Sequence, residues 1–421
     1  MNKALTIEGN HPLEGRVNTH GAKNSALPLL AATLLTDEPV VLNNIPDLQD
    51  VATMLDMITQ LGKEVTPLSP ASYRISGTVN STTAPVELVT KMRASFLVLS
   101  PLVGRYGEAQ VALPGGCTIG SRPVNLHLEG LSSLGATITQ EDGRIRAHAE
   151  KLLGSDIFLD YPSVGTTEQL IMAAITANGT TRIYNPAREP EIKDLIHLLC
   201  KLGADISVEE NAIFIQGTET LGGAEHQVIS DRIEAGTYLL AGAITGGQVT
   251  VTDTDPQYLK AITLKLREAG LEVKEKEREV TVVGDNRPSG IEVTTLPYPG
   301  FPTDLQAPIT AMLCIADGES VIEETVFDSR VDHVPELNKL GAKITLAKPD
   351  TIFITGTNTL QGTSVDAPDI RAGAALILAG LASKGKTTIS GMEHVDRGYT
   401  ELVTNLGNLG AQIRRTDISD E

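Results

Sequence analysis

A short sequence motif recurs six times along this chain of 421 residues. Its copies are variants of Leu-Gly-Ala followed by one residue and an aliphatic side chain. The motif glycines are Gly62, Gly135, Gly203, Gly270, Gly341 and Gly410. Successive glycines are 73, 68, 67, 71 and 69 residues apart, which is too regular for chance recurrence of a common dipeptide. The chain is therefore predicted to fold as six copies of one structural unit.

Each copy contains two kinds of helix. The first is apolar or small-sided nearly all round, as in residues 166–179 and 369–385, and such a helix is expected to be buried on every side. The second is amphipathic and ends at the glycine motif, as in residues 189–205. Strand-like runs follow both helices and one precedes the first, which gives the order βαβαββ. This pattern predicts an α/β fold with buried helices surrounded by sheets.

The ring of repeats is predicted to close on itself. The last strand of the unit is recognisable in five copies but missing from the sixth, and residues 4–9 at the N-terminus have the missing pattern. We therefore expect two lobes of three repeats: residues 20–230, and residues 1–19 together with 231–421. Two chain crossings join such lobes, and a cleft between them is a natural ligand site.

Composition restricts the class of protein. The net charge of -19 and the 3% aromatic content argue against a nucleic-acid surface, which is usually basic with aromatic stacking platforms. The longest apolar run, residues 372–382, is shorter than the roughly 18 residues of a membrane span, and the N-terminus lacks the apolar region of a signal peptide. We expect a cytoplasmic protein without membrane or nucleic-acid partners; its oligomeric state is open. The three cysteines support neither a disulfide framework nor a metal site.

The segment 113–122, LPGGCTIGSR, carries the most reactive combination of residues in the chain. A pair of glycines gives the backbone the freedom to hold the Cys117 side chain over a ligand, and Arg122 is a planar cation suited to phosphate or carboxylate. A surface hairpin with an incidental cysteine is the alternative. Cys200 and Cys314 lie on apolar helices, where we expect inert packing residues.

Charged and polar residues gather at the starts of the apolar helices, where free N–H groups favour anions. Asp231 and Asp369 are interpreted as helix caps. Lys23, Arg93 and Arg371 oppose the helix dipole, so each is expected to have an acidic neighbour or an anionic ligand. The other candidates at these starts are Asn24, Thr166, Glu168, Arg232 and Asp304, of which Asp304 is equally a cap or a functional group. Four more arginines precede amphipathic helices, with a solvated surface role as the alternative: Arg122, Arg188, Arg330 and Arg397.

Taken together, eight segments resemble the UDP-N-acetylglucosamine enolpyruvyl transferases. They are GAKNSALPLLAA, MRAS, LPGGCTIGSRPVNLH, AREPEI, DRIEAGT, FPTDLQA, ETVFDSR and HVDRGY, and they span essentially the whole chain. The resemblance implies a two-domain inside-out α/β barrel with three βαβαββ repeats per domain. It also implies transfer of the enolpyruvyl group of phosphoenolpyruvate to the 3-hydroxyl of UDP-N-acetylglucosamine, with release of phosphate, as the first committed step of bacterial peptidoglycan synthesis. No metal or organic cofactor is implied.

The resemblance assigns a role to each matching residue. Lys23, Arg122 and Arg397 match the cations that hold phosphoenolpyruvate. Cys117 matches the general acid that protonates its methylene carbon, and a thiol can also add to the neighbouring carbon. Asp304 matches the base for the sugar hydroxyl. The matching substrate contacts are Lys23, Asn24, Arg93, Arg122, Pro123, Val124, Asn125, Leu126, Ser163, Val164, Gly165, Asp304, Val326, Arg371 and Arg397.

Two positions depart from the family pattern, and both fall among the expected nucleotide contacts. Asn125 stands where many members have aspartate, and Tyr161 with Pro162 replaces a lysine-containing pair. They leave the details of uridine binding open and are compatible with a second isoform.

Three alternative functions remain. A shikimate-type enolpyruvyl transferase shares the fold and donor, but the Cys117 loop and residues 122–127 argue against it. A non-catalytic ring of repeats would need polar, basic helices along a channel. A redox-sensing thiol protein would need a resolving cysteine near Cys117, and the sequence has none there.

Overall fold

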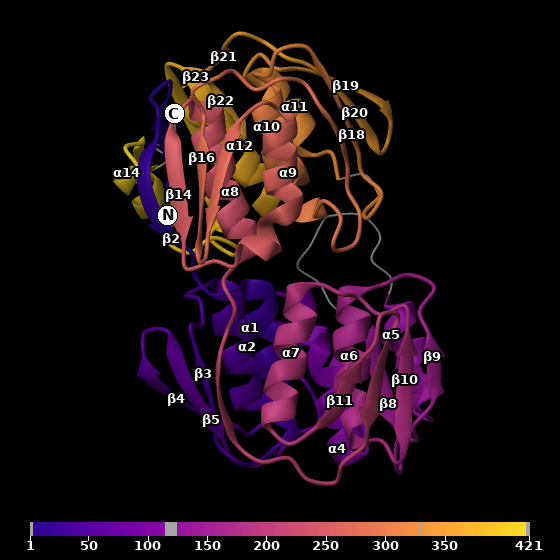
Figure 1. Cartoon of the computed structure of the whole chain (residues 1–421). Helices are drawn as coiled ribbons and strands as arrows, with labels where there is room; N and C mark the ends of the chain where they lie inside the picture. Colours follow the sequence, from indigo (N-terminus) through magenta and orange to yellow (C-terminus); the bar gives the residue numbers. More distant parts are fainter. Residues whose placement is uncertain (1–2, 114–123, 329, 418–421) are drawn as a thin grey trace. The chain divides into compact units, whose positions relative to one another are not determined.

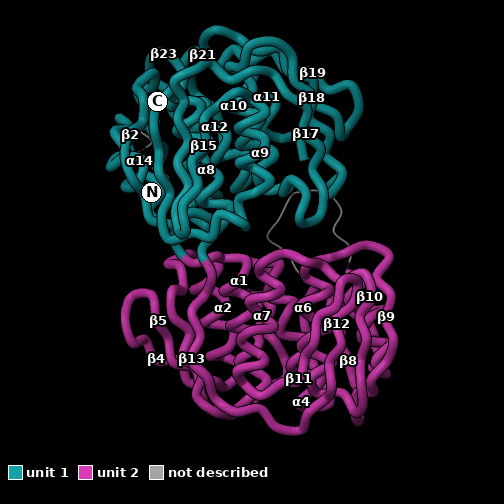
Figure 2. The backbone as a smooth tube through the Cα atoms, viewed as in Figure 1, with its two compact units in different colours: residues 1–20, 118–121, 230–421 teal, residues 21–117, 122–229 magenta. Residues whose placement is uncertain are grey.

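The computed structural model describes residues 3–113, 124–328 and 330–417, which form two compact units (Figures 1 and 2). Unit 1 contains the described residues of 3–20 and 230–417. Unit 2 contains residues 21–113 and 124–229. Within the described ranges, no helix combines the length and the apolar character that a membrane span requires.

Unit 2 consists of three sheets, apolar helices that lie buried among them, and amphipathic helices with one solvent-exposed face. The strands are β3 (Val40–Asn43), β4 (Glu64–Ser69), β5 (Ser72–Ser76), β6 (Glu108–Ala112), β7 (Thr137–Glu141), β8 (Arg144–His148), β9 (Asp156–Phe158), β10 (Thr180–Tyr184), β11 (Asp205–Val208), β12 (Ala212–Gln216) and β13 (Ala224–Gln227). The helices are α1 (Lys23–Ala32), η1 (Thr33–Leu35), α2 (Gln49–Gln60), α3 (Val86–Val89), η2 (Arg93–Val98), α4 (Leu99–Tyr106), α5 (Asn125–Ser133), α6 (Val164–Thr176) and α7 (Pro190–Lys201). The sheet orders are β13–β3–β5–β4, β6–β8–β7 and β11–β12–β10–β9.

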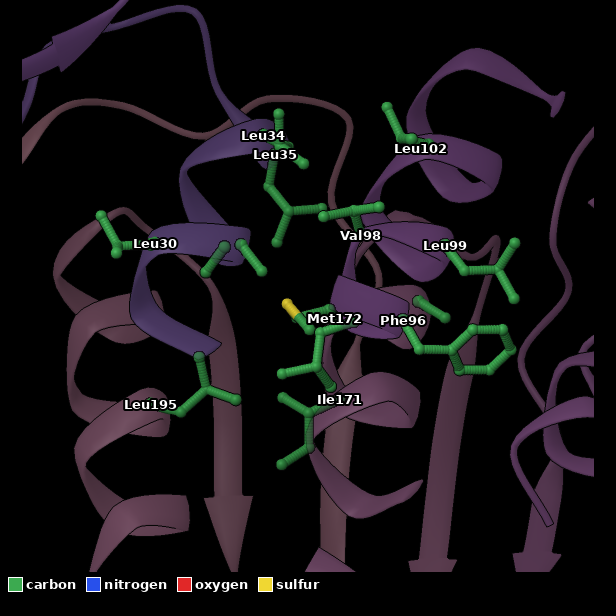
Figure 3. Close-up of a cluster of buried hydrophobic side chains, with 14 of the residues drawn as sticks. Leu30, Leu34, Leu35, Phe96, Val98, Leu99, Leu102, Ile171, Met172 and Leu195 are labelled. Carbon is green, nitrogen blue, oxygen red and sulfur yellow. The ribbon is translucent and has the colours of Figure 1, made fainter. Parts of the chain in front are cut away.

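The apolar helices form the core of unit 2, as their sequences predict. Every residue of α6 from Thr166 to Ile175 is buried. Figure 3 shows Ile171 and Met172 of α6 lying between Leu30 of α1 and Phe96 of η2. A helix with apolar or small side chains all round cannot face water on any side, so the sheets must cover it.

Unit 1 repeats this plan. Its strands are β1 (Lys3–Glu8), β2 (Glu14–Asn18), β14 (Gln248–Thr252), β15 (Glu272–Lys276), β16 (Glu279–Val283), β17 (Glu292–Thr294), β18 (Glu319–Glu323), β19 (Lys343–Lys348), β20 (Thr351–Thr355), β21 (Leu360–Gln361), β22 (Ser364–Asp366), β23 (Ser383–Lys384), β24 (Lys386–Ser390) and β25 (Gln412–Asp417). Its helices are α8 (Arg232–Thr245), η3 (Pro256–Leu259), α9 (Lys260–Glu268), η4 (Thr303–Leu305), α10 (Gln306–Leu313), α11 (His333–Lys339), α12 (Ile370–Ala382), α13 (Met392–Val395) and α14 (Leu402–Asn408). The sheets are β15–β16–β14–β2, β17–β18–β20–β19, β22–β24–β1–β25 and β21–β23, and helices α8, α10 and α12 contact one another.

The N-terminal strand closes the sixth repeat, as the sequence predicts. Strand β1 lies between β24 and β25 and is antiparallel to both, with Leu5 opposite Ile389 on one side and Arg415 on the other. The first strands of two repeats pair with strands of a different repeat, and the sequence pattern did not predict these partners. Strand β2 precedes α1 but pairs with β14 in unit 1, and β13 precedes α8 but pairs with β3 in unit 2.

The recurring glycine motif is a helix C-cap. All six motif glycines have positive φ, from 84° at Gly270 to 115° at Gly62, a conformation that costs other residues energy. After α5, the N–H of Gly135 donates to the carbonyl of Ser132 and the N–H of Ala136 to that of Leu131. This is the Schellman pattern, and it explains why the motif marks the end of each amphipathic helix.

Candidate functional site

In unit 1, Asp304 lies between two buried arginines. Its Oδ2 is 2.8 Å from Nη2 of Arg371, the second residue of α12, and its Oδ1 is 3.0 Å from Nη2 of Arg330. The Asp304 side chain is 23% exposed, whereas those of Arg330 and Arg371 are 5% and 7% exposed. Asp304 lies inside the short helix η4 and is not its N-cap residue. Asp304 was interpreted either as a helix cap or as a functional group, and the structure excludes the helix cap.

These arginines fix the charge state of Asp304. Desolvation alone would raise the pKa of the Asp304 carboxyl, but Arg371 and Arg330 outweigh it and hold that pKa well below its usual range. Burial opposes the charge on Arg371, yet Asp304 raises the pKa of the guanidinium. Asp304 and Arg371 are therefore both charged at neutral pH, and the carboxylate is available as a hydrogen-bond acceptor with one partly exposed side.

A hydrogen-bonded chain leads from Asp304 to the predicted contact Val326. Nη1 of Arg330 donates to Oγ1 of Thr303 at 2.9 Å, and this hydroxyl donates to Oε2 of Glu324 at 2.8 Å. The other oxygen of Glu324 accepts the backbone N–H of Val326 at 2.9 Å. Hydrogen bonds thus connect the segment that follows β18 to the ion pair of Asp304 and Arg330.

The predicted helix caps are confirmed. Asp231 accepts the backbone N–H groups of Ile233 and Glu234 at 2.8 and 3.0 Å. Asp369 accepts those of Arg371 and Ala372 at 2.7 and 3.1 Å. Each carboxylate satisfies N–H groups that a helix start leaves without intrahelical partners.

In unit 2, Lys23 is the first residue of α1 and is buried. Its Nζ is 3.3 Å from Oδ2 of Asp50 in the first turn of α2, and Asp50 is buried too. The anion expected beside this cation is therefore an acidic neighbour in this structure. Asn24 follows Lys23 and is half-buried, and Arg93 begins η2.

Helices α5 and α6 bring together two of the predicted contact segments. Residues 124–126 lie at the start of α5, and residues 163–165 at the start of α6, where Oγ of Ser163 accepts the N–H of Thr166 at 3.4 Å. A Cβ at Gly165 would lie 3.2 Å from Cε1 of His127, so the close approach of the two helices favours glycine there.

His127 lies at the junction of these helices. The ring is buried, Nδ1 is hydrogen-bonded to Oε1 of Gln169, and Phe96 packs edge-on against it. Burial lowers the pKa of His127 to about 4; the bond to Gln169 opposes this shift, and the charge of Arg93 reinforces it. The imidazole is therefore neutral at neutral pH.

Comparison with known proteins identifies the family. The family model of EPSP synthase (3-phosphoshikimate 1-carboxyvinyltransferase) matches residues 7–406. A protein of Caldanaerobacter subterraneus subsp. tengcongensis named UDP-N-acetylglucosamine 1-carboxyvinyltransferase 1 is 46% identical, with 99% of this chain and all of that protein covered. The chain belongs to the enolpyruvyl transferase family. Proteins named UDP-N-acetylglucosamine 1-carboxyvinyltransferase from Granulibacter bethesdensis and Finegoldia magna are 47% and 48% identical over 98% and 99% of this enolpyruvyl transferase, and over 99% and 100% of their own lengths.

Solved structures agree with the predicted fold class. The enolpyruvyl transferase NikO of Streptomyces tendae has a TM-score of 0.89 and 27% identity, with 99% of each chain covered. An EPSP synthase of Acinetobacter baumannii has a TM-score of 0.76 at 18% identity, with 99% of this chain and 100% of that one covered. The second likeness shows the fold alone. The α/β architecture predicted for this enolpyruvyl transferase, with buried helices inside sheets, is confirmed.

Some predicted site residues of this enolpyruvyl transferase lie outside the described residues: Cys117, Arg122 and Pro123. Arg397 is half-buried between α13 and α14, and Asn125 is exposed at the start of α5. Among the residues that the structure describes, no group of three or more His, Cys, Asp or Glu side chains is arranged to hold a metal ion.

The prediction that Cys200 is a packing residue was wrong, and the prediction for Cys314 is confirmed. Cys200 is exposed on the solvent face of α7, whose buried stripe is formed by neighbours such as Leu198 and Leu199. The helix is amphipathic, but Cys200 directly follows two apolar residues in the sequence, which suggested that it is buried with them. Cys314 is fully buried, and burial raises its pKa to about 12, so this thiol is unreactive.

Sequence reasoning did not include Arg330, Asp50 or His127 among the site residues. Arg330 was recognised as a cation before an amphipathic helix, with a surface role as the alternative, but it is buried against Asp304. No local signal pairs residues 26 positions apart. An aspartate in the first turn of α2 and a histidine inside α5 look like ordinary helix residues until the tertiary contacts are known.

Proposed function

We propose that this enolpyruvyl transferase moves the enolpyruvyl group of phosphoenolpyruvate to the 3-hydroxyl of UDP-N-acetylglucosamine and releases phosphate. The observation that carries the proposal is the 46–48% identity, over nearly the whole chain, to three proteins named for this activity. In the cell, the reaction is the first committed step of peptidoglycan synthesis in the cytoplasm. It therefore serves cell-wall growth, cell shape and division.

The reaction is an addition followed by an elimination. The sugar 3-oxygen bonds to the central carbon of phosphoenolpyruvate, while the methylene carbon takes up a proton and becomes a methyl group. The bond from the central carbon to the phosphate oxygen then breaks, the methyl group loses a proton, and the double bond is restored. Protons and electrons balance without an oxidant or reductant.

Asp304 is the proposed acceptor of the hydroxyl proton. Its ionised state and partly exposed side chain support this role. A carboxylate held by two arginines is a weak base, so the proton transfer must accompany attack on the protonated donor, when the hydroxyl becomes acidic. Arg330 and Arg371 keep the carboxylate oriented during this step.

Cys117, Arg122, Lys23 and Arg397 are proposed to act on phosphoenolpyruvate. Cys117 delivers the proton to the methylene carbon, and the three cations hold the phosphate and the carboxylate. Lys23 already has an anionic partner in Asp50 at 3.3 Å. A dianionic phosphate therefore competes with Asp50 for the Lys23 ammonium, or shares it.

The sugar nucleotide is proposed to contact the starts of α5 and α6. Residues 124–126 and 163–165 supply backbone groups and side chains there, beside the neutral ring of His127. Asn24, Arg93 and Val326 are the other proposed nucleotide contacts, and Arg371 is a proposed substrate contact beside Asp304.

Phosphate release with two acceptors tests the function. We expect phosphate from phosphoenolpyruvate in the presence of UDP-N-acetylglucosamine, and background release with shikimate 3-phosphate. The second acceptor is included because the matching family model is described by the shikimate reaction. Release that depends on shikimate 3-phosphate instead would overturn the proposal.

A further inference from the structure

A buried tyrosine, Tyr399, connects two parts of the proposed site in unit 1. It is 3% exposed, and its hydroxyl lies 3.1 Å from Nη1 of Arg371 and 3.1 Å from Oγ1 of Thr237 in α8. The Thr237 hydroxyl donates its only hydrogen to the carbonyl of Ile233 at 2.8 Å. The phenol hydrogen therefore points to Thr237, and a phenol lone pair faces Arg371.

This contact fixes Arg371 at a second point. One terminal nitrogen of the guanidinium donates to Tyr399, and the other donates to Asp304 at 2.8 Å. Because the guanidinium is planar and rigid, the position of Nη1 determines where Nη2 meets the carboxylate. Burial raises the pKa of Tyr399, so the phenol keeps its proton at neutral pH.

The same residue ends the segment that carries Arg397. Tyr399 follows Arg397 by two positions, and Gly398 lies between them. A Cβ at Gly398 would lie 2.6 Å from Cγ2 of Ile370, which is the first residue of α12 and the neighbour of Arg371. The segment that carries Arg397 is therefore packed directly on the start of α12. The hydrogen bond between Tyr399 and Arg371 connects the two.

We propose that Tyr399 is a positioning residue that acts through Arg371 on Asp304 and holds the Arg397 segment in register with both. It touches neither substrate. Its role rests on the proposed function, because Asp304 is the proposed base and Arg397 a proposed phosphoenolpyruvate contact. The buried Tyr399 hydroxyl thereby keeps the distance between Asp304, the proposed proton acceptor, and Arg397, a proposed phosphoenolpyruvate contact, constant within unit 1.

Tyr399→Phe tests the proposal, with Tyr238→Phe as the matched control. Tyr238 is fully buried in α8, directly after Thr237, and its hydroxyl accepts from Nδ2 of Asn405 at 3.0 Å. Both substitutions remove one buried phenol oxygen and leave the ring. Only the first removes the acceptor of Arg371.

The first measurement is steady-state phosphate release together with calorimetric binding of UDP-N-acetylglucosamine. We expect Tyr399→Phe to lower kcat about tenfold or more, because small misplacements of reacting groups are costly, with the Kd within about twofold of wild type. Tyr238→Phe keeps kcat within about twofold. Equal loss of kcat in both variants, unchanged kcat in Tyr399→Phe, or parallel loss of binding overturns the positioning role.

The second measurement needs no substrate. Thermal unfolding is compared for Tyr399→Phe, Asp304→Asn and the double variant. Because both residues share Arg371, we expect their Tm shifts to be non-additive, whereas those of Tyr238→Phe and Asp304→Asn add. Additive shifts for Tyr399→Phe and Asp304→Asn contradict the network. If the shifts are non-additive but the protein uses neither UDP-N-acetylglucosamine nor shikimate 3-phosphate as acceptor, the proposed function is contradicted. The hydrogen-bond network of Tyr399, Arg371 and Asp304 is then still supported.

Discussion

At the level of single residues, the proposed site in unit 1 depends on how the Asp304 carboxylate is shared between two arginines. Asp304 accepts from Arg371 on one oxygen and is paired with Arg330 on the other. Arg330 therefore belongs with Arg371 as a group that orients Asp304.

Substitution of Asp304 tests this view. Asp304→Asn keeps the size of the side chain but removes the proton acceptor, so we expect turnover to be abolished while binding of UDP-N-acetylglucosamine stays within about tenfold of wild type. Phosphate release and calorimetry measure the two effects. Asp317→Asn, at a side chain that is 81% exposed, is the control and keeps full activity. Loss of binding in Asp304→Asn would make Asp304 mainly a recognition residue.

The sequence identified Asp304, Arg371 and Lys23 as candidates because each lies at the start of an apolar helix. It left the partners open, since pairing depends on distances between segments that are far apart in the chain. Asp50 beside Lys23 and Arg330 beside Asp304 became visible only through the tertiary structure. Such partners are as important to the chemistry as the candidates themselves, because they set charge and orientation.

At the level of elements, α5 and α6 meet at a buried neutral histidine. His127 is a polar group at this junction, and its ring contacts α6 through Gln169 and lies against Gly165. The preceding residues 122–126 match sugar-nucleotide contacts of the family, but the sequence indicates no structural role for His127. Burial in this contact favours the uncharged ring, which links the packing of the two helices to pH.

His127 should make stability depend on pH. Its pKa is about 4 in the folded chain and about 6.5 when unfolded, so between these values the unfolded state binds more protons and stability falls as pH falls. We expect the wild-type free energy of unfolding to drop by about 2 kcal/mol more between pH 7 and pH 5 than that of His127→Gln. Denaturant titrations at both pH values measure the difference. The same slope in both proteins would show that His127 is not the group responsible.

For the strands, the sequence predicted which segments are strands but not every pairing partner. The closing strand β1 was predicted from its pattern, since the sixth repeat lacked a last strand and the N-terminus supplied one. The pairing of β2 with β14 and of β13 with β3 was not, because both β2 and β13 have the pattern of a first strand and both precede an apolar helix. Periodicity states that a strand will pair but does not identify its partner when two sheets offer equivalent edges.

At the level of the whole molecule, one chain builds two similar units from repeats that are closed by its own N-terminus. Strand β1 is an inner strand of its sheet, and Leu5 and Ile7 on it are fully buried in the core of unit 1. The first residues of the chain therefore contribute to the stability of a unit whose other residues follow position 230. This closure makes the N-terminal segment part of the fold.

Truncation of a side chain in this strand measures the contribution. Ile7→Ala should lower the free energy of unfolding by about 2–5 kcal/mol, the range for large-to-small substitutions in a core. Leu346→Ala, at a strand residue that is 44% exposed, should change it by less than about 1 kcal/mol. Denaturant unfolding compares the two. Equal, small effects would mean that β1 is not an integral strand of unit 1.

The identity of the product tests the proposed enolpyruvyl transfer most directly. Phosphoenolpyruvate labelled with ¹³C at its central carbon is incubated with UDP-N-acetylglucosamine and the full chain, and the product is examined by NMR. We expect a labelled vinyl ether carbon coupled to the proton on carbon 3 of the sugar, with one phosphate released per ether formed. Phosphate release that yields labelled pyruvate, or an ether formed only when shikimate 3-phosphate is the acceptor, would contradict the proposed transfer.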